Sequence, residues 1–262
     1  MNTKPTHLYD AYIFDLDGTV FLGEALLPSA RETIAYLRSK GKKTVFLSNN
    51  PTHTRQEYAD KLTHLGVPTR ANEVINSSAV MVDFLKRVLP EGRLFVVGEK
   101  PLQNELLQAG FTLSENTKRI EAVIASFDRT FTYRKLQIAF DAIRAGARFF
   151  ATNSDRYCPV PNGGEPDAAA VIAAIEACTS VQVEVVVGKP SHYMVEAILK
   201  LTGLPGEICL MVGDRLETDI RMGLENGIDA ALTLTGATTA AMLAVSPIRP
   251  TYICQTLADL IP

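Results

Sequence analysis

Residues 11–19 of the chain, AYIFDLDGT, join a short apolar run to two acidic residues and a glycine. The apolar run Ala11–Phe14 predicts a buried strand that ends where the acidic residues begin. Residues i and i+2 of an extended chain point to the same side, so the carboxylates of Asp15 and Asp17 are expected to converge, and Gly18 permits a sharp turn. Adjacent carboxylates repel unless a cation or a shared proton offsets their charge, and oxygen-only ligands suit Mg²⁺. The alternative is a turn with solvated acids, since Asp-Gly is common in turns.

Apolar strands and amphipathic helices alternate toward both ends of the chain. This alternation is typical of βαβ units, so we predict an α/β fold with a doubly wound parallel sheet. Val183–Val187, rich in β-branched residues, is predicted as a strand buried on both faces. The other strands expected in this sheet are residues 44–47, 208–212, 230–234 and 252–254, and the helices between them are residues 28–40, 54–65, 191–201 and 218–225.

A second alternating block fills the middle of the chain. Its predicted strands are residues 94–97, 122–125 and 148–151, and its predicted helices are residues 101–109, 133–145 and 167–178. The block spans about 100 residues, which is the size of a domain. Periodicity leaves open whether it extends the first sheet or folds separately.

Polar residues follow four of the strands predicted for the parallel sheet. Besides Asp15 and Asp17 they are Ser48, Asn49 and Asn50, then Lys189, then Asp214 and Asp219. Each group alone has an ordinary explanation, such as a polar loop, a surface lysine or an acid that favours a helix N-terminus. In a doubly wound sheet, however, all four strand ends share one edge. Carboxylates there need a divalent cation, while a lysine, a hydroxyl and amides suit a phosphoryl group, so together they predict a phosphoryl-transfer site.

Composition argues against several classes of protein, among them nucleic-acid-binding, disulfide-rich and membrane-spanning proteins. The 262 residues include 26 basic and 29 acidic ones, for a formal charge of −3, so no nucleic-acid partner is expected. The four cysteines form no Cys-x-x-Cys pair, which is typical of neither a disulfide framework nor a zinc site and fits a reducing cytosol. The N-terminus lacks the apolar core of a signal peptide, and no apolar stretch has the length of a membrane span. We therefore expect a cytoplasmic protein without a membrane partner.

The four motifs together resemble those of the haloacid dehalogenase (HAD) superfamily. DLDGT at 15–19 matches the first motif, Ser48 the second, Lys189 the third and GDRLETD at 213–219 the fourth. The segments FLSNN, ATNSD and VVGKP are similar to those of the NagD-like branch of 4-nitrophenyl, nucleotide, sugar, phosphoglycolate and pyridoxal phosphatases. The resemblance spans the chain and implies a Rossmann-like core formed by residues 1–81 and 183–262. Residues 82–182 would form an inserted α/β cap that determines substrate specificity.

The resemblance also implies a role for each motif residue. Asp15 would be the nucleophile that forms an aspartyl-phosphate, and Asp17 the general acid and base. Mg²⁺ would be held by the Asp15 side chain, the Asp17 backbone carbonyl and Asp214. Ser48, Asn49 and Lys189 would bind phosphoryl oxygens, and Asp219 would orient Lys189 or a metal-bound water.

Contacts to the leaving group are expected from the core and from the cap. Asn50 is the candidate from the core, and Asp155 and Arg156, with Tyr157, are the candidates from the loop 153–167. Asp155 has the alternative of merely ordering a loop rich in glycine and proline. The implied partner is a small phosphorylated metabolite of the 4-nitrophenyl phosphate, sugar phosphate, nucleoside monophosphate or phosphoglycolate class. Caps in this branch often take part in dimers, so the cap is the expected surface of a homodimer.

Two other functions fit part of the pattern. A phosphomutase or phosphotransferase would use the same fold but pass the phosphoryl group to an acceptor other than water. A non-enzymatic phosphoaspartate receiver also places acids and a lysine on a parallel sheet. A receiver needs only about 120 residues and no inserted block, and it would lack a general acid two residues after the nucleophile. Asp17 therefore favours the enzyme.

Overall fold

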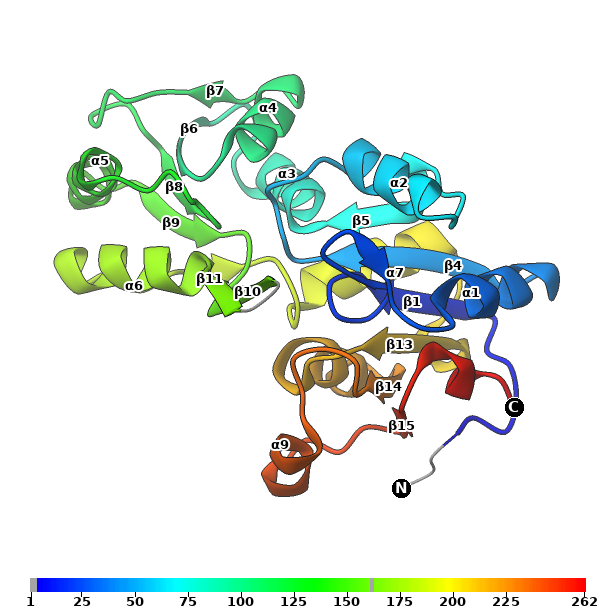
Figure 1. Cartoon of the computed structure of the whole chain (residues 1–262). Coiled ribbons are helices and arrows are strands. Elements are labelled where there is room, and N and C mark those ends of the chain that lie inside the picture. The colour runs from blue at the N-terminus through cyan, green and yellow to red at the C-terminus, as the bar shows by residue number, and fades with distance from the viewer. Residues whose placement is uncertain (1–3, 161–162) are drawn as a thin grey trace.

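The computed structural model describes residues 4–160 and 163–262, and these contain two parallel sheets flanked by helices (Figure 1). The larger sheet has six strands in the order β15-β14-β13-β1-β4-β5, with every neighbouring pair parallel. Its strands are β1 (Ala11–Asp15), β4 (Lys43–Ser48), β5 (Val74–Asn76), β13 (Cys209–Gly213), β14 (Asp229–Thr233) and β15 (Tyr252–Cys254). The predicted doubly wound core is confirmed, with β5 as a strand that the sequence pattern missed.

Both faces of this sheet are buried because successive side chains of a strand point to opposite sides. Tyr12 and Phe14 of β1 pack in a cluster with α1 (Ala30–Ser39) and α2 (Arg55–His64). Ile13 packs on the other face with α3 (Ser77–Val88) and α7 (His192–Thr202). A capping box opens α2, where Thr54 Oγ1 accepts from the Glu57 backbone N–H.

The middle block folds as a second sheet with the strand order β12-β9-β8-β6-β7. Its strands are β6 (Arg93–Val97), β7 (Thr112–Leu113), β8 (Ala122–Ala125), β9 (Arg148–Ala151) and β12 (Val185–Val186). The flanking helices are α4 (Lys100–Gln108), α5 (Tyr133–Arg144) and α6 (Ala168–Thr179). The strands and helices expected in this block are confirmed, and the block does not extend the first sheet.

One strand was assigned to the wrong sheet. The strand predicted over residues 183–187 in the core is the two-residue β12, which pairs with β9 through Val185↔Phe150 and Val186↔Ala151. Glu184 interrupts the apolar run, and its carboxylate accepts from Arg148 at 2.8 Å, so this strand is an edge of the second sheet and not a doubly buried one. The second sheet therefore extends past the expected boundary at residue 182.

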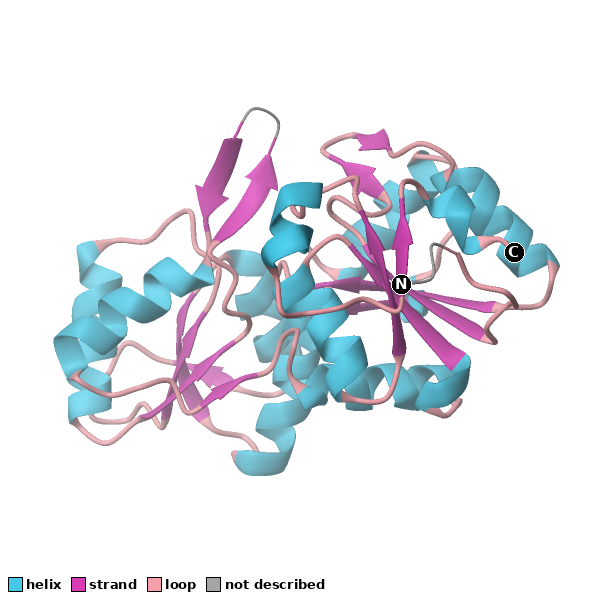
Figure 2. Cartoon of the chain, turned by 90° about the horizontal axis from the view of Figure 1, so that it is seen from below, coloured by secondary structure: helices cyan, strands magenta, loops and turns pink. Residues whose placement is uncertain are grey.

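Three further segments differ from the expectation. The predicted loop 153–167 contains an antiparallel hairpin of β10 (Tyr157–Val160) and β11 (Gly163–Pro166), which projects from the molecule in Figure 2. A smaller hairpin, β2 (Phe21–Leu22) and β3 (Ala25–Leu26), follows the first motif. The helix expected over 218–225 begins earlier, as a π-helical turn (Leu216–Ile220) that leads into α8 (Arg221–Glu225), and α9 (Ala240–Val245) was not predicted.

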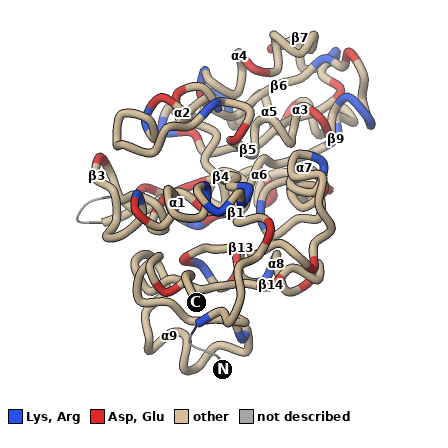
Figure 3. Tube along the Cα trace, turned by 90° about the vertical axis from the view of Figure 1, so that its right-hand side faces the viewer, with Lys and Arg blue, Asp and Glu red and all other residues tan. Residues whose placement is uncertain are grey.

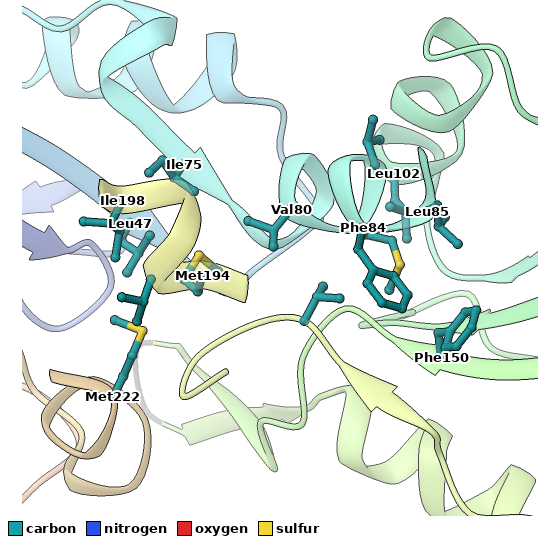
Figure 4. Packing of buried hydrophobic residues seen from close by; sticks show 14 of the residues in the cluster. Leu47, Ile75, Val80, Phe84, Leu85, Leu102, Phe150, Met194, Ile198 and Met222 are labelled. Atoms are coloured by element: carbon teal, nitrogen blue, oxygen red, sulfur yellow. The ribbon is translucent and has the colours of Figure 1, made fainter. Parts of the chain in front are cut away.

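An apolar cluster joins the two sheets (Figure 4). Phe84 of α3 meets Phe150 of β9 and Tyr193 of α7, with ring centroids 5.1 and 5.0 Å apart. Basic and acidic residues are interspersed along the chain (Figure 3). Among the described residues, none of the helices combines the length and hydropathy that crossing a membrane requires.

Candidate active site

The acidic residues of the first and fourth motifs meet at the carboxyl ends of β1 and β13. Asp15 is the last residue of β1, and Asp214 directly follows β13, its neighbour in the sheet. Gly18 has a φ of +87°, and a Cβ at this position would lie 2.5 Å from Asp214 Oδ2. The glycine therefore allows the chain to turn sharply while its backbone packs against the acid.

Lys189 is the cation of the site, although it arrives from the end of β12 and not from a core strand. Its side chain is buried, and Nζ donates to Asp15 Oδ1 at 2.5 Å and to Asp219 Oδ1 at 2.6 Å. Burial alone would lower the pKa of Lys189, but the two carboxylates outweigh burial and raise it. The lysine is therefore a fixed positive charge beside Asp15, and Asp219 orients it as expected.

Asn49 positions the backbone of Lys189. Its Oδ1 accepts from the Lys189 N–H at 2.8 Å, and its Nδ2 donates to the Lys189 carbonyl oxygen at 3.3 Å. Nδ2 also donates to Asp155 Oδ2 at 3.0 Å. Asn49, the residue after β4, thus links the core to the segment that follows β9.

A cation site is formed by the buried carboxylates of Asp15, Asp214 and Asp219, which offer oxygens that all lie within 4.8 Å of one another. Asp214 Oδ2 accepts from the Ala237 N–H, but Oδ1 is buried and has no hydrogen-bond partner in the described chain. Burial raises the pKa of Asp214 well above its usual value, and the neighbouring Asp15 and Asp219 raise it further. An orphaned carboxylate oxygen within an oxygen-only donor set fits a hard divalent cation such as Mg²⁺.

Asp17 lines the same cavity as Asp15, but its side chain is not part of the three-carboxylate cluster. Burial raises the pKa of Asp17, while the positive charges of Lys61 and Lys189 partly oppose this. A carboxyl group with a raised pKa keeps its proton closer to neutral pH, which is what a general acid requires.

Ser48 and Asn50 lie at the carboxyl end of β4 and line the cavity. Ser48 Oγ donates to Tyr58 Oη at 3.1 Å and accepts from the Asn50 N–H at 3.1 Å. Tyr58 Oη in turn donates to the Asn50 carbonyl oxygen at 3.1 Å. Tyr58 lies on the buried side of α2 and was not among the predicted site residues, yet it fixes the loop that carries the second motif.

The cavity is lined on one side by the segment between β9 and α6, is partly open to solvent, and has a volume of about 40 Å³. Such a volume holds a few water molecules. Asp155, Tyr157, Cys158, Pro159 and Asp167 line it from this side. Asp155 and Tyr157 were expected here, whereas Cys158, Pro159 and Asp167 were not.

Arg156 was expected beside the leaving group, but the structure places it away from the cavity. Its side chain is exposed and does not line the cavity, and its carbonyl oxygen accepts from the Asp167 N–H. Arg215, from the fourth motif, lies there in its place. Its Nη2 donates to the Tyr157 carbonyl oxygen at 3.0 Å, its guanidinium lies 5.1 Å from the centre of the Tyr157 ring, and Nη1 lies 3.9 Å from Asp155 Oδ1. The position of Arg215 directly after Asp214 was the signal for it.

Known proteins are similar to this chain in sequence and in fold. The model of the haloacid dehalogenase-like hydrolase family matches residues 12–112, and a second HAD-hydrolase-like model matches residues 186–260. The sugar-phosphatase AraL of Bacillus subtilis is 42% identical over 225 residues, which cover 86% of this chain and 83% of that protein.

Solved structures agree over nearly the whole chain. The 4-nitrophenylphosphatase of Thermotoga maritima superposes with a TM-score of 0.91 at 33% identity, covering 96% of this chain and 95% of that one. NagD from E. coli K-12 superposes with a TM-score of 0.87 at 30% identity, covering 97% and 99%. The chain therefore belongs to the haloacid dehalogenase superfamily and, within it, to the NagD-like branch of phosphoric monoester hydrolases.

Proposed function

We propose that the protein is a Mg²⁺-dependent phosphatase that hydrolyses phosphomonoesters of small metabolites through an aspartyl-phosphate. The observation that carries this proposal is the buried Lys189 ammonium that bridges Asp15 and Asp219 next to the orphaned oxygen of Asp214. A nucleophile, a phosphate-binding cation and a cation-binding oxygen cluster are thereby within reach of one phosphoryl group.

The reaction follows from the arrangement of the carboxyl groups. Lys189 holds Asp15 Oδ1, which leaves Oδ2 to attack phosphorus while the bond to the leaving alkoxide breaks. Asp17 gives its proton to the alkoxide and then takes one from the water that hydrolyses the aspartyl-phosphate. Ser48, Asn49 and Lys189 bind the phosphoryl oxygens. Mg²⁺ held by Asp15, Asp214 and the Asp17 carbonyl would reduce the repulsion between the nucleophile and the phosphoryl oxygens.

The similar proteins favour a small substrate. One is named a sugar-phosphatase and another a 4-nitrophenylphosphatase, so sugar phosphates and 4-nitrophenyl phosphate are the first candidates here. Nucleoside monophosphates and phosphoglycolate are the other classes implied by the resemblance. The second sheet and the β10–β11 hairpin would act as the cap that selects among them. Homodimerisation through this cap and a cytoplasmic location stay predictions.

Replacement of the nucleophile tests the proposal. Asp15→Asn removes the attacking carboxylate with little change in shape, so release of inorganic phosphate from 4-nitrophenyl phosphate should fall by about 10³-fold or more. Chelation of divalent ions with EDTA should abolish the wild-type activity, and added Mg²⁺ should restore it.

Asp10→Asn is the matched control, because Asp10 lies just before β1 and, among the described residues, its exposed side chain pairs with Lys42 alone, at 2.7 Å. This variant should keep wild-type activity. Turnover by Asp15→Asn at the wild-type rate would exclude Asp15 as the nucleophile, and phosphate found on an organic acceptor in place of water would exclude a hydrolase.

A further inference from the structure

The wall of the cavity that the segment between β9 and α6 forms together with Arg215 carries more negative than positive charge. Asp155 and Asp167 contribute carboxylates there, and Arg215 is the cation. The guanidinium of Arg215 lies 3.9 Å from Asp155, whereas Asp167 forms no ion pair within residues 4–160 and 163–262. The charge of Asp155 is thus partly offset by an ion pair, whereas Asp167 has Arg215 only as a more distant opposing charge.

The carboxylate of Asp167 is held in a fixed position. Asp167 is only 3% exposed and caps α6, where Oδ1 accepts from the Ala168 N–H at 2.5 Å and from Asn153 Nδ2 at 3.0 Å. Both of these donors use Oδ1, and no donor to Oδ2 is found in the described part of the chain. Oδ2 is therefore the oxygen that remains to accept from a ligand.

We propose that Asp167 is a specificity-determining residue whose carboxylate favours phosphomonoesters with an uncharged, hydroxyl-bearing leaving group and rejects those with a second anionic group. The inference rests on the proposed phosphatase function and narrows its substrate class. Lys189 and the second motif line the same cavity as Asp167, so a leaving group attached to a phosphoryl group held there lies within reach of the Asp167 carboxylate.

The chemistry of this wall discriminates by charge. A hydroxyl of the leaving group donates to a carboxylate in a charge-assisted hydrogen bond. A carboxylate on the leaving group would instead meet a buried like charge, and repulsion is strong where water is excluded. Burial raises the pKa of Asp167 to about 7, so the carboxylate is mainly ionised at pH 8.

A matched pair of substrates tests this inference. Glycerol 3-phosphate and 3-phosphoglycerate have the same carbon chain and phosphoryl group, but the second carries a carboxylate in place of a hydroxymethyl group. At pH 8 with Mg²⁺, the wild-type kcat/KM should be at least about tenfold higher for glycerol 3-phosphate. In Asp167→Asn that ratio should fall by about tenfold, because the amide keeps Oδ1 for Ala168 and Asn153 but removes the charge.

Glu165→Gln is the matched control. Glu165 lies two residues earlier on β11, its side chain is 42% exposed and it does not line the cavity. This variant also loses one negative charge, two residues before Asp167, and should keep the wild-type ratio of the two kcat/KM values. Thermal unfolding confirms that both variants are folded, and if Asp167→Asn does not fold, the wild-type ratio alone decides.

Each outcome separates the inference from the proposed function. A wild-type preference for 3-phosphoglycerate overturns the role of Asp167, and so does a folded Asp167→Asn with an unchanged ratio. In both cases, hydrolysis of 4-nitrophenyl phosphate by the wild type would still support the proposed phosphatase function. Absence of any Mg²⁺-dependent hydrolysis of 4-nitrophenyl phosphate by the wild type overturns both.

Discussion

The carboxyl group of Asp167 makes the stability of the folded chain depend on pH. Burial raises its pKa from 3.8 to about 7 in the folded state. A carboxyl group whose folded pKa is raised favours folding only while it is protonated, so this stability is present below about pH 4 and is lost as the pH rises to 7. Replacing Asp167 with Asn removes the dependence. The free energy of unfolding of Asp167→Asn minus that of wild type should therefore be about 1–3 kcal/mol larger at pH 8 than at pH 5.

Urea unfolding of both proteins at pH 5 and pH 8 measures this difference. Groups away from Asp167 are common to the two proteins, so the change in the stability gap belongs to Asp167 and to the neighbouring Asp155, whose charge acts on it. Glu165→Gln, which removes a 42% exposed carboxylate that lies 3.8 Å from Arg129, should change the stability little. A gap for Asp167→Asn that does not grow between pH 5 and pH 8 would mean that the carboxylate is already solvated.

Single residues differ in how far the sequence reveals their role. Asp15, Lys189 and Asp214 were identified because acids, polar side chains and a lysine follow four predicted strands whose ends would share one edge of the sheet. Asp167 looked like an ordinary helix start, and it is one, but the fold also turns it toward the cavity. Arg215 had a signal in its position directly after Asp214, whereas the outward direction of the Arg156 side chain has none in the neighbouring sequence.

The hairpin β10–β11 is the element whose position depends most on a contact with the core. Arg215 donates to the Tyr157 carbonyl oxygen and covers the Tyr157 ring. Lysine keeps the charge but lacks the planar group that makes both contacts. In Arg215→Lys, amides of 157–160 and 163–166 should exchange hydrogen faster, and kcat/KM should fall by about tenfold, mainly through a higher KM.

Arg221→Lys provides the comparison for this element. Arg221 begins α8 in the same region of sequence, but it is half exposed and pairs with Glu225 four residues later. This substitution should leave both exchange and KM unchanged. Equal hairpin exchange in Arg215→Lys and wild type would show that other contacts hold the hairpin closed.

Strands and helices were predictable where the apolar residues recur with a regular period. They were not predictable where tertiary contacts determine the local structure. The strands β1, β4, β8, β9 and β13 are short apolar runs next to turn residues, and all were found. The hairpin contains Pro159 and paired glycines, which argue against strands, and it forms against Arg215 in spite of them. The run 183–187 was correctly predicted to include a strand, but its pairing partner lies in a segment far away in sequence.

At the scale of the whole molecule, the two sheets share one apolar cluster and are not joined merely by linkers. Phe84 lies where the units meet, between Phe150 of the second sheet and Tyr193 of α7. The sequence predicted a domain-sized block in the middle of the chain. The residues that pack this block against the core could not be identified, because their apolar pattern is the same as that of any buried helix face.

Because Phe84 packs against both units, its truncation should weaken them together. Phe84→Ala leaves a cavity beside Phe150 and Tyr193, and such a change typically costs about 3–5 kcal/mol. We expect urea unfolding of wild type and variant to remain a single transition, with the midpoint shifted to lower urea. Tyr133→Ala, at a position that is 80% exposed at the start of α5, should change the stability by less than about 0.5 kcal/mol. Two separate transitions in the wild type, one of them insensitive to Phe84→Ala, would show that the second sheet is stable without the shared cluster and that the units fold independently.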